Sequence, residues 1–234
     1  MKRLIISCLL WAGILLSLST STAGSSFLRE SRDIKDFHSV DIKGNFEVLL
    51  KQDKRHALQV EAGSKLMNHI TSEVEDGVLV IRMDKKRGNL KKTRLYISSP
   101  EYRLIKTSGT VDIWSQDALS GDKLRLHLAG AGDWQLALDY RALNAKLAGA
   151  GSMKLRGQVR SAELNLGGAA NVMAYELNAQ AVEVELKGTG AAKVFAAENL
   201  EVSITGLGAV TYEGNPEVYR HITGFGTLRK RASS

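Results

Sequence analysis

The chain of 234 residues contains little cysteine, proline or aromatic side chain. Its single cysteine, Cys8, lies in an apolar N-terminal segment, so the rest of the chain has no disulfide and no thiol for catalysis. Two prolines exclude a proline-rich linker. Aromatic residues make up 6%, and the basic clusters at 85–94 and 229–231 lack interleaved aromatics, so we predict no nucleic-acid partner. Stability must therefore come from aliphatic packing.

Glycine, by contrast, is frequent and recurs at a fixed period. A motif of the type Leu-Ala-Gly-Ala-Gly occurs six times, with the first glycine of each copy at 130, 149, 168, 188, 206 and 224. Repeats of this length predict a solenoid in which each copy, called a rung below, forms one coil. The glycines that we expect at the turns are Gly130, Gly132, Gly149, Gly151, Gly168, Gly188, Gly190, Gly206, Gly208, Gly224 and Gly226.

Aliphatic and polar residues alternate ahead of each first glycine. Positions six, four and two residues before it are aliphatic, and those between them are mostly polar. This period of two indicates strands buried on one face. A meander of antiparallel hairpins would use the same alternation, but the return of the same face in every repeat favours parallel stacking at about 4.8 Å per rung. One rung carries an extra residue, which we place at Ala191 or Ala192.

Residues 1–23 have the pattern of a cleaved signal peptide. Basic residues open the chain, an apolar run covers 4–18, and Ser21-Thr22-Ala23 fits a cleavage site. A membrane anchor is disfavoured because the run is shorter than the roughly 20 residues that a spanning helix needs. A lipid attachment at Cys8 is disfavoured because the apolar run continues beyond it. We therefore expect no integral membrane segment after cleavage.

The remaining chain divides by pattern. Residues 24–102 predict an N-terminal β segment of the same domain, 103–230 the repeats, and 231–234 a tail. A helical turn is expected at 64–70, with Ser64 as its cap. Since a parallel stack leaves an open edge at each end, we expect the N-terminal strands to cap one end and the charged residues at 219–221 and 229–231 to protect the other.

Few residues suggest chemistry, and we predict no catalytic residue and no cofactor. The Gly-x-Gly turns match neither a dinucleotide-binding nor a Walker sequence, and the five histidines are scattered. If the rungs stack in register, Glu163, Glu183 and Glu201 form one outward column. The first interpretation is a solvated face balanced by basic residues. The alternatives are a divalent-cation site and a pair of catalytic carboxylates.

The sequence resembles a family of bacterial envelope proteins, the "putative auto-transporter adhesin, head GIN domain" family. The segments that carry the resemblance are residues 37–48, 70–81 and 212–226, together with the serial Gly-x-Gly turns. Ala170 in place of a glycine, and Thr107-Ser-Gly109 as a degraded first copy, depart from the pattern. The resemblance implies a right-handed β-helix-like fold and export to the envelope, and it does not imply an enzyme.

Taken together, these features predict an all-β, exported, non-enzymatic solenoid. It would act as an adhesin-like binding or structural module in the periplasm or at the cell surface of a Gram-negative bacterium. Its partner would be an envelope protein or a glycan, and a homo-oligomer stays open. Two alternatives are a β-helical carbohydrate-active enzyme using the glutamate column, and an envelope assembly or stress factor acting through protein contacts.

Overall fold

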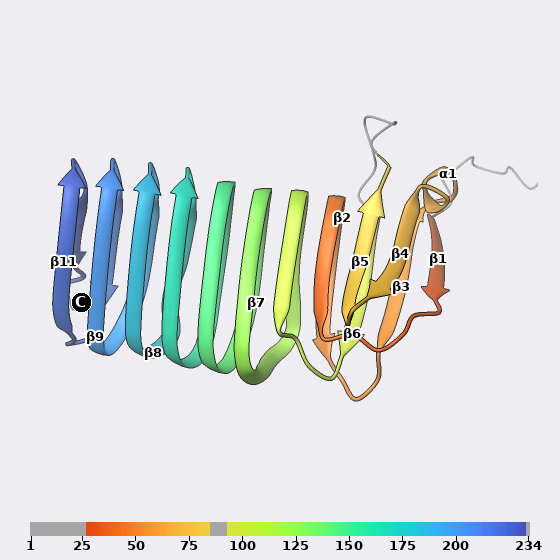
Figure 1. Cartoon of the computed structure of the whole chain (residues 1–234), viewed down its shortest axis with the longest axis horizontal. Helices are drawn as coiled ribbons and strands as arrows, with labels where there is room; N and C mark the ends of the chain where they lie inside the picture. The colour runs from red at the N-terminus through yellow and green to blue at the C-terminus, as the bar shows by residue number, and fades with distance from the viewer. Residues whose placement is uncertain (1–26, 85–92, 233–234) are drawn as a thin grey trace, which may run out of the picture.

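The computed structural model describes residues 27–84 and 93–232 (Figure 1). The expected signal peptide with Cys8, and most of the basic cluster at 85–94, lie outside the described residues. The described chain is all-β apart from one short helix, which confirms the predicted class. Its elements are β1 (Phe27–Arg32), β2 (Ser39–Gln52), β3 (Ala57–Gly63), α1 (Ser64–Met67), β4 (Ile70–Glu75), β5 (Val78–Met83), β6 (Thr93–Ser99), β7 (Leu104–Gly168), β8 (Asn171–Gly188), β9 (Ala191–Gly206), β10 (Ala209–Glu213), β11 (Glu217–Gly224) and β12 (Thr227–Lys230).

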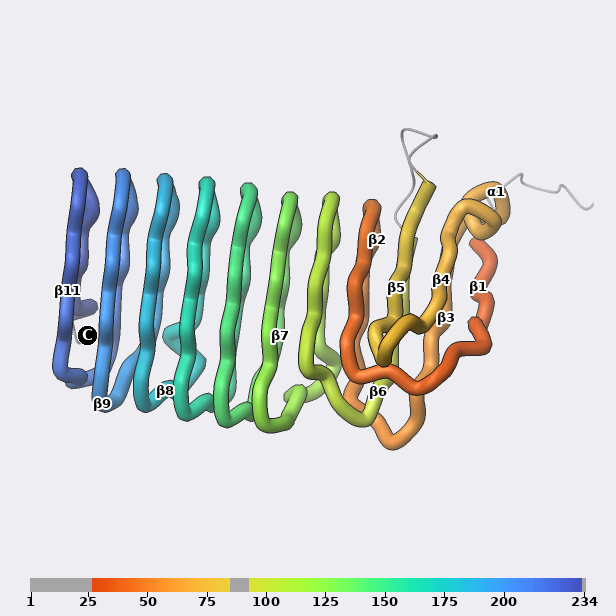
Figure 2. The backbone as a smooth tube through the Cα atoms, viewed as in Figure 1, coloured from red at the N-terminus to blue at the C-terminus, as the bar shows by residue number. Residues whose placement is uncertain are grey.

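Successive repeats pair in parallel with one another. Strand β8 pairs with β7 and β9, and β9 pairs with β10 and β11, all in parallel. The first glycines are Cα partners, with Gly168 opposite Gly188, Gly188 opposite Gly206, and Gly206 opposite Gly224. Figure 2 shows the chain returning on itself once per repeat, so that the strands lie side by side along the long axis. The alternating pattern therefore places the same side-chain column on the same face in each rung.

A continuous aliphatic interior results from this register. The residues four after each first glycine form one such column, in which Trp134, Met153, Val172, Ala192 and Val210 are all buried. Trp134 is fully buried, and its indole N–H donates to the Val111 carbonyl at 3.1 Å. Full burial of one large apolar side chain is worth about 1.5–3 kcal/mol. Each rung contributes several such side chains, so the rungs stabilise one another.

The N-terminal strands lie at one end of the stack (Figure 1). Strand β2 pairs in parallel with the start of β7, and on its other side it pairs in parallel with β5 and β6. It therefore occupies the position of one more rung at this end of the stack. Beyond it, β3 and β1 add antiparallel strands, with β1 at the edge. Helix α1 begins at Ser64, but its N-cap is Gly63 and no side chain caps it, so the predicted Ser64 cap is wrong.

The extra residue of the long rung lies elsewhere than predicted. Asn171 pairs with Ala191 and Val172 with Ala192, so the columns keep their phase there. The register between β7 and β8 shifts instead where Lys154 pairs with Met173 and Arg156 with Glu176. The additional residue therefore forms a bulge at Ala174–Tyr175. Ala174 stays buried in the interior, and the ring of Tyr175 lies under the Arg231 guanidinium.

Charged residues occupy interior columns at the opposite end. Arg220 stands opposite the buried Val202, and Lys230 stands opposite Tyr212. Charges at inward positions of a terminal strand discourage pairing with another chain. Within residues 27–84 and 93–232, no helix has both the length and the apolar character needed to cross a bilayer.

Candidate functional site

The turn glycines form a column in which each backbone lies against the preceding rung. Gly149 has a φ of +147°, and a Cβ placed on it would lie 2.1 Å from the carbonyl oxygen of Gly130. All six first glycines have positive φ. The second glycines vary: a Cβ at Gly190 would lie 2.2 Å from the Ala170 oxygen of the preceding rung, whereas a Cβ at Gly208 would lie 2.3 Å from Cδ2 of Leu186 in the interior. These turns therefore bring successive rungs too close together for a side chain.

The column starts earlier than the repeat pattern indicates. Gly109, which the sequence presents as a degraded copy, is opposite Gly44, and a Cβ on Gly109 would lie 2.3 Å from the Gly44 oxygen. Sequence reasoning missed Gly44. It lies 65 residues before Gly109, because β3 to β6 are inserted between the two rungs. The flanking Lys43-Gly44-Asn45 was the only local signal.

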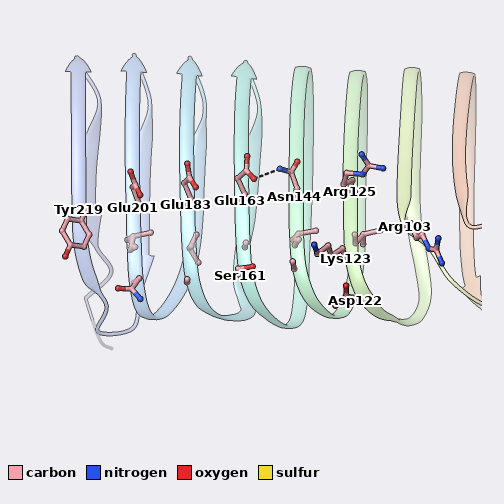
Figure 3. Close-up of a pocket in the computed structure, with 18 of the residues that line it drawn as sticks. Arg103, Asp122, Lys123, Arg125, Asn144, Ser161, Glu163, Glu183, Glu201 and Tyr219 are labelled. Atoms are coloured by element: carbon pink, nitrogen blue, oxygen red, sulfur yellow. Dashed lines mark hydrogen bonds between the residues drawn. The ribbon is translucent and has the colours of Figure 1, made fainter.

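The glutamates predicted to share a column do so. Glu163 is the Cα partner of Glu183, Glu183 of Glu201, and Glu201 of Tyr219. All three carboxylates are exposed, and Figure 3 shows them on the same face of neighbouring strands. Adjacent members are about 4.8 Å apart along the stack. Asn144 of the preceding rung donates to Glu163 at 2.6 Å, and Asn165 donates to the other oxygen of Glu163 at 2.7 Å.

An open groove of about 1170 Å³ runs along this column and crosses β7, β8, β9 and β11. Its floor holds the aliphatic residues six before each first glycine. Small side chains at Ala142, Ser161 and Ala181, seven before each first glycine, lie across this floor from the glutamate column. The lining comprises Glu101, Arg103, Asp122, Lys123, Leu124, Arg125, Ala142, Leu143, Asn144, Ser161, Ala162, Glu163, Ala181, Val182, Glu183, Asn199, Leu200, Glu201 and Tyr219. The sequence placed the glutamates correctly, but the small residues that hollow the surface gave no separate signal.

The unpaired charges in the groove are segregated, since Glu101 and Asp122 at its basic end pair with Arg103 and Arg141. Lys123 and Arg125 lie toward one end, while Glu183 and Glu201 lie toward the other (Figure 3). Within the part of the chain that the structure describes, none of these four side chains has an ion pair or a side-chain hydrogen bond. Burial and the neighbouring Glu163, Glu201 and Glu185 raise the pKa of Glu183 above its ordinary value. The groove thus presents unneutralised charge of both signs.

Metal chelation finds little support in this arrangement. Among the described residues, no three carboxylate, imidazole or thiol groups converge on a point where they could hold one metal ion. The glutamates point outward side by side and do not surround a centre. Binding of a cation between two neighbouring glutamates stays a prediction.

His127 lies on a neighbouring outward column. Burial, together with the nearby Lys146 and Lys106, lowers the pKa of its imidazole.

Catalysis by the column would need two carboxylates on either side of a scissile bond. Neighbouring glutamates have about the spacing of a retaining glycosidase pair, whose carboxyl groups are about 5–5.5 Å apart. However, Glu163, Glu183 and Glu201 project from one face in one direction. The geometry is better suited to a row of equivalent contacts along an elongated ligand.

Comparison with solved structures gives the same architecture. A putative adhesin from Bacteroides fragilis NCTC 9343 is 26% identical, with a TM-score of 0.83 over 89% of this chain and 98% of that one. A putative lipid binding protein from Parabacteroides distasonis ATCC 8503 is 20% identical, with a TM-score of 0.68 over 88% of this chain and 97% of that one. The latter likeness shows the fold alone. No curated protein matches the chain.

The family assignment rests on most of the sequence. The model of the "putative auto-transporter adhesin, head GIN domain" family matches residues 36–216, which include the inserted N-terminal strands and five of the six glycine turns. This confirms the resemblance seen in the sequence. The chain belongs to the "putative auto-transporter adhesin, head GIN domain" family.

Proposed function

We propose that the chain is an exported, non-enzymatic, right-handed parallel β-solenoid that binds an elongated envelope component in its groove. The observation that carries this proposal is the groove itself, which crosses several rungs and repeats one outward column along its length. Binding sites of ligands are typically concave, with a few polar groups placed over an apolar floor. The handedness follows the strong preference of parallel crossover connections.

Location in the envelope is supported by two features. Residues 1–23 have the pattern of a signal peptide, and relatives in the family are named as adhesins. The compartment would be the periplasm or the outer surface. Cell fractionation combined with surface protease treatment tests this, since cleavage of the protein in intact cells identifies the surface. Recovery of full-length protein from the cytoplasm would contradict export.

Binding without catalysis is tested with a panel of envelope glycans. We expect the wild-type chain to bind one class of glycan without releasing cleavage products. A variant with Glu163, Glu183 and Glu201 all replaced by Gln should lose affinity, because these side chains line the groove. No binding of any glycan by the wild-type chain would contradict a glycan-binding module. Capture of an envelope protein in a periplasmic pull-down would instead favour an assembly or stress factor.

The second candidate is a carbohydrate-active enzyme that uses the glutamate column. The specific observation in its favour is the raised pKa of Glu183, which suits a general acid, beside carboxylates at about the spacing of a retaining pair. Release of shortened oligosaccharides by the wild-type chain, abolished in Glu183→Gln, would establish this activity. The absence of cleavage products from every glycan that binds would contradict a glycan-cleaving activity.

A further inference from the structure

We propose that the groove binds a linear glycan that lies along the stack, with amine-bearing sugars over Glu183 and Glu201 and an acidic sugar over Lys123 and Arg125. This inference rests on the proposed function and names the class of ligand for the same groove. It is carried by the direction of the groove, by its repeat, and by the separation of its unpaired charges.

The repeat of the groove fits a sugar chain. The residues five before each first glycine present one polar side chain per rung, at intervals of about 4.8 Å. A linear chain of (1→4)-linked hexoses advances by a length close to one rung per sugar. Successive sugars would therefore meet Arg125, Asn144, Glu163, Glu183 and Glu201 in turn. Carboxylate and amide groups can accept hydrogen bonds from the hydroxyl groups of each sugar.

A peptide fits this surface poorly. An extended peptide usually gains affinity by pairing its backbone with an exposed sheet edge. The groove instead crosses the face of the sheet, where the rung-to-rung ladder already uses the backbone groups of β7, β8 and β9. The amides of a bound peptide would have only side chains as partners. A glycan carries its hydrogen-bonding groups on its own substituents and needs no free backbone.

The charges give the ligand a direction. Arg125 and Glu201 are four rungs apart, which is about 19 Å along the stack. Between them, Asn144 donates a hydrogen bond to Glu163, so the polar groups in the middle of the groove are partners of each other. A uniformly anionic polymer would meet Glu183 and Glu201, and a uniformly cationic one would meet Lys123 and Arg125. A chain with its acid toward Arg125 and its amines toward Glu183 and Glu201 avoids both repulsions.

An aromatic side chain ends the acidic half. Tyr219 follows Glu201 in the column, is 56% exposed, and donates its hydroxyl hydrogen bond to Glu217. This hydrogen bond holds the ring at the end of the groove (Figure 3). A tyrosine ring offers an apolar face with a polar rim, on which the C–H face of a sugar can stack. The last amine-bearing sugar would therefore lie against Tyr219.

Three hexasaccharides separate these contributions in titration calorimetry at low ionic strength, just below neutral pH. One has glucuronate as its first sugar, glucosamine as its fourth and fifth, and neutral sugars elsewhere, and therefore carries both charges in the order of the groove. Its N-acetylated form carries only the acid, and a deacetylated chitosan oligomer carries only amines. We expect the first to bind about tenfold tighter than either of the others, because removal of one favourable charge contact costs about 1.4 kcal/mol.

The variants should act selectively. Glu183→Gln should weaken the two amine-bearing oligomers about tenfold and leave the acid-only oligomer unchanged. Arg125→Gln should weaken the two acid-bearing oligomers about tenfold and leave the amine-only oligomer unchanged. Glu185→Gln is the matched control, because Glu185 lies two residues further along β8 and pairs with Lys187 outside the groove. It should change no affinity. Circular dichroism of each variant checks that the fold is retained.

Three results would overturn the inference. They are equal affinity for the three oligomers, equal weakening of all three by both variants, or oligo-lysine binding as tightly as the amine-bearing glycans. These results differ from failure of the proposed function, in which the wild-type chain binds no envelope glycan at all. Binding that ignores the charge pattern therefore contradicts only the ligand class.

Discussion

Replacement of Gly149 by alanine tests how closely successive rungs approach each other. The new Cβ would lie 2.1 Å from the Gly130 oxygen and 3.0 Å from its carbonyl carbon and nitrogen, all of them backbone atoms. The residue also has a φ of +147°, where a non-glycine residue is strained by about 1–3 kcal/mol. Relief of the clash would displace this rung from the preceding one, which contains Gly130, and would disturb the ladder hydrogen bonds between the two.

The expected cost is a large part of the total stability. Each disturbed ladder hydrogen bond adds about 0.5–1.5 kcal/mol to the strain, so we expect Gly149→Ala to lower the free energy of unfolding by about 4 kcal/mol. Domains of this kind have about 5–15 kcal/mol in total. Urea titration followed by tryptophan fluorescence measures the effect, because Trp134 is fully buried and its emission changes when unfolding exposes the indole ring to water. The bulkier Gly149→Val should cost at least as much.

Gly167→Ala is the matched control in the neighbouring turn. A Cβ at Gly167 would meet only the Leu147 oxygen at 3.6 Å, which is an ordinary contact, and its φ is not positive. We expect this variant to lie within about 0.5 kcal/mol of the wild type, or slightly above it, because alanine restricts the unfolded chain. If Gly149→Ala were equally silent, the argument from close approach of the rungs would be refuted.

Three further predictions concern the groove, the interior and the end of the stack. Glu183→Gln should raise the free energy of unfolding by about 0.5 kcal/mol at neutral pH, because it removes like-charge repulsion between neighbouring strands. The raised pKa of Glu183 means that the ionised form destabilises the fold, so this gain should vanish as the pH falls through that pKa, and a gain that grows in acid would contradict it. Trp134→Ala should cost about 3–5 kcal/mol in urea titration, through a cavity and an unpaired Val111 carbonyl, and a loss below 1 kcal/mol would refute full burial. Arg220→Leu should cause concentration-dependent association in sedimentation, because it removes a charge from an interior column at the open end; a variant that associates no more than the wild type would count against edge protection.

The register of the repeats was predictable because two independent signals agree. The glycine spacing fixes where each turn lies, and the alternation of aliphatic residues fixes which face is buried. The Cα pairing of Glu163, Glu183 and Glu201 follows from these two signals alone. A single-residue slip would turn every aliphatic side chain in a strand toward water.

Features without a local signal were not predictable. Gly44 pairs with Gly109 only because the inserted strands β3 to β6 leave the stack and return to it. The bulge at Ala174–Tyr175 could not be located, since alanine is tolerated both inside and outside the stack. The sequence pattern gives the period of a rung but not where an extra residue is absorbed.

The groove was predictable only in part. Its charged side chains were visible as an outward column, but its depth depends on small neighbours such as Ala142, Ser161 and Ala181. In a sequence, a small residue at an exposed position looks like any other solvated residue. Only stacking in register turns three such residues into one continuous depression.

Distances between spin labels test the parallel stacking most directly. Lys106, Glu185 and His221 occupy equivalent outward positions, three before the first glycine of their rungs, and the wild-type chain has only Cys8 to remove before labelling. Lys106 and Glu185 should be about 19 Å apart and Lys106 and His221 about 29 Å, since these pairs are separated by four and six rungs. A distance that rises in proportion to the number of rungs is the predicted result. Hairpins that place two strands of each repeat side by side in one sheet would give about twice these distances, roughly 38 Å and 58 Å, and would contradict the account.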